Sequence, residues 1–298
     1  MDSVKQPRTA VSGSRLSGKQ RDLAQILLFV AIAYSLMFIF GPLAYSQTAG
    51  ADMKKQIFYH LAAFSPTIAC VIVRYAFGEG FRDDILFPKF GGHKKAYLLS
   101  VALPLLFGLV ACVLVTIVLG AGFSFKSEGG AADALLNNML MSAQFYYAAF
   151  ILIGEEFGWR AFLYDKLEKH CGLHASLIIG GILWGVWHLP PLVCMGLNFG
   201  TDAPGFPVTN VALMCVFCIF AGAMMQLLRR MSDSVIAPLI AHAVIDTVCN
   251  TLISLFLNEE LAAGKQFTIG LCLVAAIRIV GIPCWITLGR RKSIPLID

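Results

Sequence analysis

The sequence contains little charge. Only 14% of its 298 residues are Asp, Glu, Lys or Arg, whereas 58% are hydrophobic. Soluble globular domains have about 25% charged residues, so this composition excludes an ordinary soluble domain. The apolar excess also excludes an intrinsically disordered chain, and a net charge of +5 is too small to indicate nucleic-acid binding. The composition predicts an integral membrane protein whose first partner is the lipid bilayer.

Several chemical signatures are also missing. The nine cysteines are spread along the chain and mostly lie in apolar segments, which indicates packing rather than a disulfide scaffold. Cys215 and Cys218 have CxxC spacing, but no second pair accompanies them, which disfavours metal or redox use. The sequence contains no HExxH zinc-protease motif and no internal repeat of the kind found in many transporters.

Eight apolar stretches are long enough to cross a bilayer core of roughly 30 Å, which takes about 20 helical residues. They are residues 24–45, 57–77, 97–119, 140–162, 174–193, 209–228, 235–257 and 267–288. Continuous apolar runs favour helices over the alternating strands of a membrane barrel. The predicted fold class is all-α, a polytopic bundle of about eight transmembrane helices. Its location would be the plasma membrane of a prokaryote or the endoplasmic reticulum of a eukaryote.

Basic residues predict the orientation of the bundle. Sixteen of the 23 Lys and Arg residues lie in the tails and loops of one side, four lie on the other side, and three lie inside spans. The positive-inside rule then places both termini in the cytosol, in agreement with an even number of spans.

The chain divides into three predicted parts. Residues 1–22 would form a flexible basic cytosolic arm, residues 23–289 a single transmembrane domain with its motif core at 140–257, and residues 290–298 a short cytosolic tail. A passable signal-peptide cleavage site ends at Ser46, but the first apolar run is longer than the usual 7–15 residues, which favours an uncleaved first span.

Ionisable side chains inside spans are costly, so each one is a candidate for function. They are Arg74, Glu155, Glu156, Arg160, Asp246 and Arg278, together with His60, His174, His188 and His242. Arg74, His60 and His174 lie near span ends, and Arg278 has no ionisable neighbour. For these four we favour a structural role.

Glu155 and Glu156 are adjacent acids within the fourth span. Glu156 and Arg160 are four residues apart with the acid first, the favourable order for an ion pair on a helix. Glu155 is five residues from Arg160 and points about 100° away from Glu156. We therefore assign Glu156 to charge compensation and predict that Glu155 faces a different surface, where it can act as a general base.

Histidines on two further spans complete a predicted polar pocket. Glycine pairs on the fourth and fifth spans should let these helices pack closely and bring His188 to Glu155. These are Gly154 with Gly158 and Gly181 with Gly185. On the seventh span, His242 and Asp246 share one helical face. Such a set supports hydrolysis by a carboxylate-activated water. Alternatively, Glu155, His188 and His242 could bind zinc.

Three motifs now stand in order: EExxxR (Glu155, Glu156, Arg160), an aromatic residue four before a histidine (Trp184, His188), and Hxxx[N/D] (His242, Asp246). Over residues 155–246 the chain resembles the CAAX-protease and bacteriocin-processing family, which comprises intramembrane endopeptidases related to the type II prenyl-protein protease. The resemblance implies that Glu155 activates water together with His188. It also implies that His242 and Asp246 help to hold the oxyanion.

The resemblance gives Glu156 and Arg160 a supporting role, and Trp184 a packing role. Two positions depart from the family's pattern. Trp184 stands where phenylalanine is more usual, and Asp246 stands where the prenyl-protease branch usually has asparagine. A carboxylate donates a hydrogen bond only when protonated, so Asp246 is expected to orient His242 or to carry a proton.

The leading hypothesis is an intramembrane endopeptidase of the glutamic type. It would act from the cytosolic side on a membrane-anchored protein or peptide, for example a prenylated CAAX protein. No metal is favoured, and zinc is the alternative cofactor. The other hypotheses are a proton- or ion-coupled transporter and a non-catalytic scaffold or immunity protein. We expect Glu155 to lie in the cytosolic half of its span. The predicted boundaries of the fifth span place His188 deeper in the membrane than Glu155.

Overall fold

The structure, a computed structural model, describes residues 17–45, 53–80, 87–89, 91–120, 143–250, 252–253 and 264–290. All regular secondary structure in these ranges is helical, which confirms the all-α class. The α-helices are α1 (Gly18–Tyr45), α2 (Met53–Ala63), α3 (Ser65–Ala76), α5 (Lys94–Leu119), α7 (Ala143–Gly158), α8 (Tyr164–Trp187), α9 (Leu189–Met195), α10 (Val208–Ser232), α11 (Ile236–Val244) and α14 (Gln266–Arg290). Two short π-helices, η1 (Trp159–Leu163) and η2 (Ile245–Cys249), continue α7 and α11.

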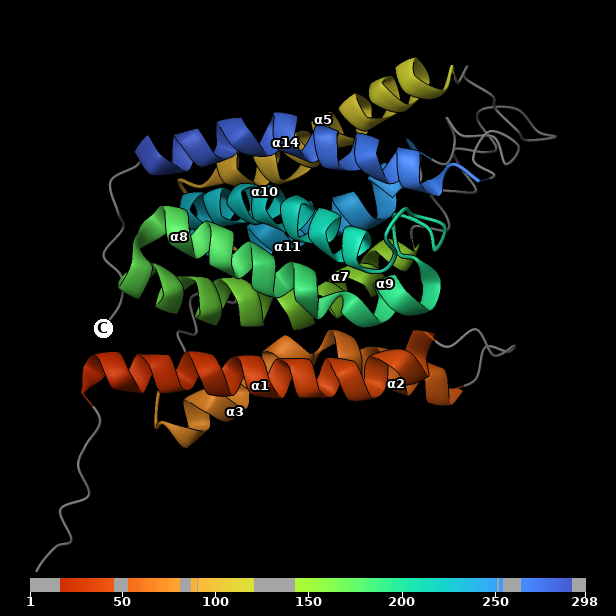
Figure 1. The fold of residues 1–298 in the computed structure, drawn as a ribbon. Coiled ribbons are helices and arrows are strands. Elements are labelled where there is room, and N and C mark those ends of the chain that lie inside the picture. The colour runs from red at the N-terminus through yellow and green to blue at the C-terminus, as the bar shows by residue number, and fades with distance from the viewer. Residues whose placement is uncertain are drawn as a thin grey trace, which may run out of the picture.

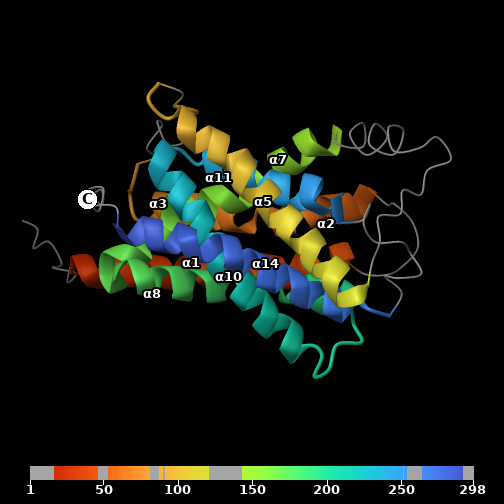
Figure 2. The same ribbon diagram turned by 90° about the horizontal axis from the view of Figure 1, so that it is seen from above.

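The helices are stacked in layers (Figure 1). The N-terminal helices α1, α2 and α3 cover one side of a middle group formed by α7, α8, α10 and α11, and α5 and α14 cover the opposite side. The start of α1 and the end of α14 lie at the same end of the bundle (Figure 1). Figure 2 shows α10 crossing beneath α14 when the bundle is seen from above.

Among the described residues, five helical stretches are long and apolar enough to cross a membrane, and the α2–α3 pair, bent by 52°, makes a sixth if it is one span. The five are α1, α5, residues 149–187, α10 and α14. The stretch from Ile236 to Cys249 is apolar but shorter. Each of the eight predicted spans contains one or more of these helices, whereas the count of eight crossings and the cytosolic termini stay predictions.

The 149–187 stretch is a hairpin rather than one straight helix. Gly172 has φ 77° and ψ 169°, a backbone conformation that is essentially confined to glycine. Beyond it the chain folds back, so that the guanidinium of Arg160 lies 4.4 Å from the centroid of the Trp184 ring. In one straight helix these residues would be about 36 Å apart. The hairpin therefore supplies the fourth and fifth predicted spans.

The glycine pairs do pack closely, but not against each other, and that prediction was wrong. Gly181 and Gly185 lie against the backbone of α10. Gly154 and Gly158 lie against the bend between α2 and α3. Each pair faces outward from the hairpin and fastens it to a different neighbour. The turn at Gly172, not glycine-mediated packing, brings the two arms together.

Charged side chains join α1 to the hairpin at the end where α1 begins. The ammonium of Lys166 lies 2.9 Å from a carboxylate oxygen of Asp22 and 2.9 Å from one of Glu79. Burial raises the pKa of Glu79, but hydrogen bonds from Gln25 and Lys166 outweigh it and hold this pKa below its usual value. Glu79 is therefore ionised at neutral pH and can pair with Lys166.

The first helix begins earlier than the predicted start at residue 24. Ser17 and Gln20 form a capping box, in which the Ser17 N–H donates to Gln20 Oε1 (3.0 Å) and the Gln20 N–H donates to Ser17 Oγ (3.4 Å). Residues 18–22 of the predicted arm are thus helical. Residues 1–16 of the arm and 291–298 of the tail lie outside the described residues.

Gly185→Ala tests the packing of the hairpin on α10. The added Cβ would lie 2.5 Å from the Cα of Cys215, and such overpacking costs about 1–3 kcal/mol. We expect a lower thermal unfolding midpoint for the purified protein in detergent. The control is Gly18→Ala, whose Cβ meets no atom within 4 Å. Equal midpoints for the two variants would contradict the close contact.

Candidate functional site

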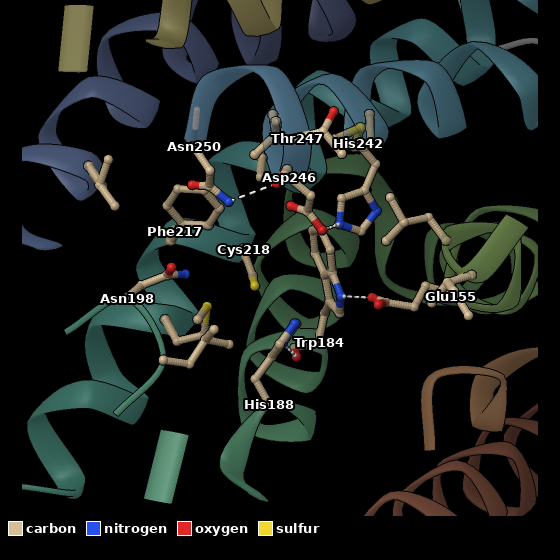
Figure 3. Close-up of a pocket in the computed structure, with 18 of the residues that line it drawn as sticks. Glu155, Trp184, His188, Asn198, Phe217, Cys218, His242, Asp246, Thr247 and Asn250 are labelled. Carbon is tan, nitrogen blue, oxygen red and sulfur yellow. Dashed lines mark hydrogen bonds and ion pairs between the residues drawn. The ribbon is translucent and has the colours of Figure 1, made fainter. Parts of the chain in front are cut away.

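Five of the seven predicted site residues line one cavity of about 610 Å³, shown in Figure 3. They are Glu155 from α7, Trp184 from α8, His188 between α8 and α9, His242 from α11 and Asp246 from η2. The two others, Glu156 and Arg160, lie behind the cavity wall and are fully buried. The structure therefore brings all three motifs to one place.

Glu156 is the centre of a buried chain of charges. One carboxylate oxygen lies 3.3 Å from Nε of Arg160, so the predicted ion pair is present. The other oxygen accepts a hydrogen bond from Nδ1 of His242 (2.9 Å). This second contact, which spacing along the chain does not predict, ties α7 to α11. It also turns Nε2 of His242 toward Asp246, whose nearest carboxylate oxygen is 3.7 Å away.

Glu155 points away from this chain of charges and into the cavity (Figure 3). Its exposed fraction is 7%, so its carboxylate is almost removed from solvent. The Nε1–H group of Trp184 donates a hydrogen bond to Glu155 Oε2 (3.0 Å). The two adjacent acids thus differ as the sequence predicts: Glu156 compensates Arg160, and Glu155 faces the cavity.

His188 lies where α8 ends and α9 begins. Pro190 and Pro191 occupy the first turn of α9, where a missing backbone N–H costs no hydrogen bond. The Nδ1–H group of His188 donates to the backbone carbonyl of Trp184 (2.8 Å), which leaves Nε2 for the cavity.

The expectation that His188 lies deeper than Glu155 was wrong. The predicted spans leave a loop at residues 163–173 between them. In the structure the helix continues through residue 171, so the chain reverses only at Gly172. Glu155 stands 17 residues before Gly172 and His188 stands 16 residues after it. The two side chains therefore reach the same level of the hairpin, about 25 Å from its turn at 1.5 Å per residue.

Two aromatic rings enclose the guanidinium of Arg160. Its central carbon lies 4.4 Å from the ring centroid of Trp184 and 4.9 Å from that of Tyr164. Cation–π contacts of this kind stabilise a desolvated guanidinium by about 2 kcal/mol. Sequence reasoning missed Tyr164, although its position four residues after Arg160 was a usable signal.

Two of the three motifs run into a π-helix. Arg160 lies in η1 and Asp246 lies in η2. A π-turn inserts one extra residue into a helical turn and re-aims the side chains that follow, and such turns are frequent at functional sites. No pattern in the sequence indicates them.

The remaining walls of the cavity divide into an apolar part and a polar part. The apolar part comprises Phe107, Met214, Phe217, Cys218, Ala221, Met225, Ile245 and Leu273. The polar part comprises Lys55, Gln56, Tyr59, Asn198, Thr247 and Asn250. Sequence reasoning missed these residues because they lie on six separate segments and no motif joins them. Gln56, an exposed member of the polar part, lies in the first turn of α2.

The three residues of the alternative zinc site, Glu155, His188 and His242, all line the cavity. Among the residues the structure describes, no group of three or more His, Cys, Asp or Glu side chains is arranged to hold a metal ion. Glu155 and His242 are instead engaged by Trp184 and Glu156, respectively.

The in-span ionisable residues that we assigned a structural role make structural contacts. Arg74 donates to the backbone carbonyls of Gly80 (2.8 Å) and Ala161 (3.0 Å). His174 accepts a hydrogen bond from the indole N–H of Trp285 (2.7 Å). None of the four residues assigned a structural role lines the cavity.

Comparison with known proteins identifies the segment that carries the site. Residues 137–248 match the family model described as Type II CAAX prenyl endopeptidase Rce1-like. Over this segment the chain is similar to the CAAX protease family. The resemblance predicted from the three motifs is thereby confirmed, since all seven motif residues lie within the matched CAAX protease segment.

One relative of the CAAX protease segment is the CAAX prenyl protease 2 of Methanococcus maripaludis, which is 33% identical over 69 residues. The aligned region covers 23% of this chain and 21% of that protein. The match thus spans about a fifth of the relative's length.

Within the CAAX protease segment, the two adjacent acids should differ in their effect on stability. Glu156→Gln leaves Arg160 as an uncompensated buried charge, and breaking a buried pair costs about 3–5 kcal/mol. We expect a clearly lower unfolding midpoint for Glu156→Gln. The matched variant Glu155→Gln retains an acceptor for Trp184 and should unfold close to the wild type. If both variants unfold at the same temperature, the assignment of charge compensation to Glu156 is wrong.

Proposed function

We propose that this chain is an intramembrane endopeptidase of the glutamic type that hydrolyses a membrane-anchored protein or peptide. The proposal rests on the different environments of the two adjacent acids. Glu156 is held by Arg160 and His242, whereas Glu155 faces a cavity that also contains His188. A buried carboxylate and an imidazole that line one space large enough for substrate suit general-base catalysis.

The proposed reaction uses the side chains as follows. Glu155, with Nε2 of His188, takes a proton from water, and the water oxygen attacks the carbonyl carbon of the scissile peptide bond. His242 stabilises the negative charge that develops on the carbonyl oxygen. Collapse of the tetrahedral intermediate breaks the C–N bond, and the proton held by Glu155 passes to the leaving amine. Asp246, 3.7 Å from His242, keeps that imidazole oriented.

The substrate we propose is a polypeptide joined to an apolar anchor, such as a prenylated protein. The cavity has an apolar wall from α5, α10 and α14 beside its polar groups, which suits a substrate with both characters. The relative from Methanococcus maripaludis is named a CAAX prenyl protease. The family match favours this function over a transporter or a scaffold. The membrane would be the plasma membrane of a prokaryote or the endoplasmic reticulum of a eukaryote.

Glu155→Gln tests the proposed reaction. Gln cannot take a proton from water, so we expect cleavage of a farnesylated CAAX peptide in proteoliposomes to fall at least about 100-fold. The matched control is Glu79→Gln, which removes a carboxylate that pairs with Lys166 outside the cavity and should retain activity.

Added chelator should leave wild-type cleavage unchanged, because the proposed mechanism needs no metal. Two results would refute the glutamic mechanism. One is full activity of Glu155→Gln, and the other is inhibition by chelator that zinc reverses.

Access to the cavity connects two further predictions. Gln56, an exposed lining residue, lies in the first turn of α2. The basic residues assign that end to the non-cytosolic side. With cytosolic termini, the α2 end would face the non-cytosolic compartment. We propose that substrate enters from the α2 end, whichever compartment it faces.

Cysteine labelling in sealed vesicles tests the position of the entrance. A membrane-impermeant maleimide should modify Gln56→Cys from one side and Lys169→Cys, at the charged end, only from the other. Modification of Gln56→Cys should also block cleavage, whereas modification of Lys169→Cys should not. The unsubstituted chain, with its nine native cysteines, provides the background. Labelling of both variants from the same side would contradict the proposed entrance.

A further inference from the structure

Trp184 contacts several charged or titratable groups of the proposed site, which a residue that only packs in the core would not need to do. The residue is 2% exposed, and its indole N–H donates to Glu155 Oε2 (3.0 Å). Its ring face lies 4.4 Å from the guanidinium carbon of Arg160. The ring of His242 meets it in a T-shaped arrangement, with centroids 5.3 Å apart and an interplanar angle of 85°. One side chain thus contacts three of the charged or titratable groups.

The backbone of the same residue holds a fourth group. The Trp184 carbonyl accepts the Nδ1–H group of His188 (2.8 Å). This hydrogen bond fixes the histidine ring and directs Nε2 away from the helix. Trp184 therefore holds Glu155 through its side chain and His188 through its main chain. A small shift of α8 would move both groups together.

The indole of Trp184 contacts both Arg160 and Glu155 and therefore couples these two charged groups. The two residues are five positions apart on the helix and are poorly placed to pair directly. A cation over the face of an indole draws electron density toward itself, which makes the N–H at the ring edge a stronger donor. A hydrogen bond to an ionised carboxylate is also shorter and stronger than a neutral one. Arg160 thus acts on Glu155 through the ring of Trp184.

We propose that Trp184 is a positioning residue that orients the Glu155 carboxylate through its indole N–H and the His188 imidazole through its carbonyl. This inference rests on the proposed function for its catalytic consequence. The contacts of Trp184 with Glu155 and His188 do not depend on that function. Phenylalanine at this position keeps the ring face and the main-chain carbonyl but loses the N–H donor, so Trp184→Phe isolates the hydrogen bond to Glu155.

Trp187 provides a matched control on the same helix. It is also 2% exposed, and its indole N–H donates to Ser65 Oγ over the same distance, 3.0 Å. Ser65 does not line the cavity. Trp187 also packs in a T-shaped arrangement against His188, with ring centroids 5.0 Å apart, and phenylalanine at position 187 keeps an aromatic ring there. Trp187→Phe therefore removes an equal amount of side chain and an equivalent buried hydrogen bond without removing a donor to Glu155. A difference between the two variants reports on the site and not on general packing.

The first measurement does not depend on activity. The chain has four tryptophans, so a ¹⁵N-tryptophan-labelled sample in nanodiscs gives at most four indole N–H signals, which Trp→Phe variants assign. We expect Glu155→Gln to shift the Trp184 signal and leave that of Trp187 in place. Ser65→Ala should do the reverse. A Trp184 signal that does not respond to Glu155→Gln would overturn the inference.

The second measurement separates a positioning role from a structural one. We expect Trp184→Phe to lower kcat about 10-fold or more with little change in KM, because a misoriented base slows the chemical step and not substrate binding. Trp187→Phe should leave kcat within about twofold of the wild type. Equal kcat values for the two variants would overturn the inference, even if wild-type cleavage confirms the proposed function. A wild type without cleavage would refute the proposed function and leave the indole signals to decide the geometry.

Discussion

The arrangement of the site depends on one constraint: a charge buried in an apolar bundle must be paired. Arg160 is completely buried, and an isolated ion in such surroundings costs far more than any single contact returns. Glu156 neutralises it from the next helical turn, and His242 binds the remaining carboxylate oxygen. These contacts fix the end of α7 against α11. Because Glu156 is committed to them, its neighbour Glu155 is the acid that is left to face the cavity.

The helical hairpin turns this local pairing into a site. Gly172 lets the chain reverse so that the end of α8 returns to the level of α7, where Trp184 donates to Glu155 and His188 lines the same cavity. The glycines on the outer faces of the hairpin hold it against α10 and against the α2–α3 bend. The cavity is therefore bounded by helices that are positioned by packing, while its polar groups are positioned by the buried charges.

The parts of this architecture that follow from local spacing were predictable from the sequence. Long apolar runs predict the helices, and the i, i+4 spacing of Glu156 and Arg160 predicts their ion pair. The hairpin turn was misplaced because the polar residues before Gly172 remain helical, so polarity did not mark the end of the helix. The hydrogen bond between Trp184 and Glu155 joins residues 29 positions apart, and the π-turn at Arg160 depends on tertiary packing. Neither has a signal in the spacing of residues along the chain.

The most direct test of this account is a double-mutant cycle between Glu156 and His242. Unfolding free energies would be measured for Glu156→Gln, His242→Gln and the double variant in the same detergent. If the buried chain of charges joins α7 to α11, the two substitutions will be coupled by about 1 kcal/mol or more. A parallel cycle between Glu79 and His242, which belong to separate networks, should be additive. Additivity within about 0.5 kcal/mol for Glu156 and His242 would contradict the account.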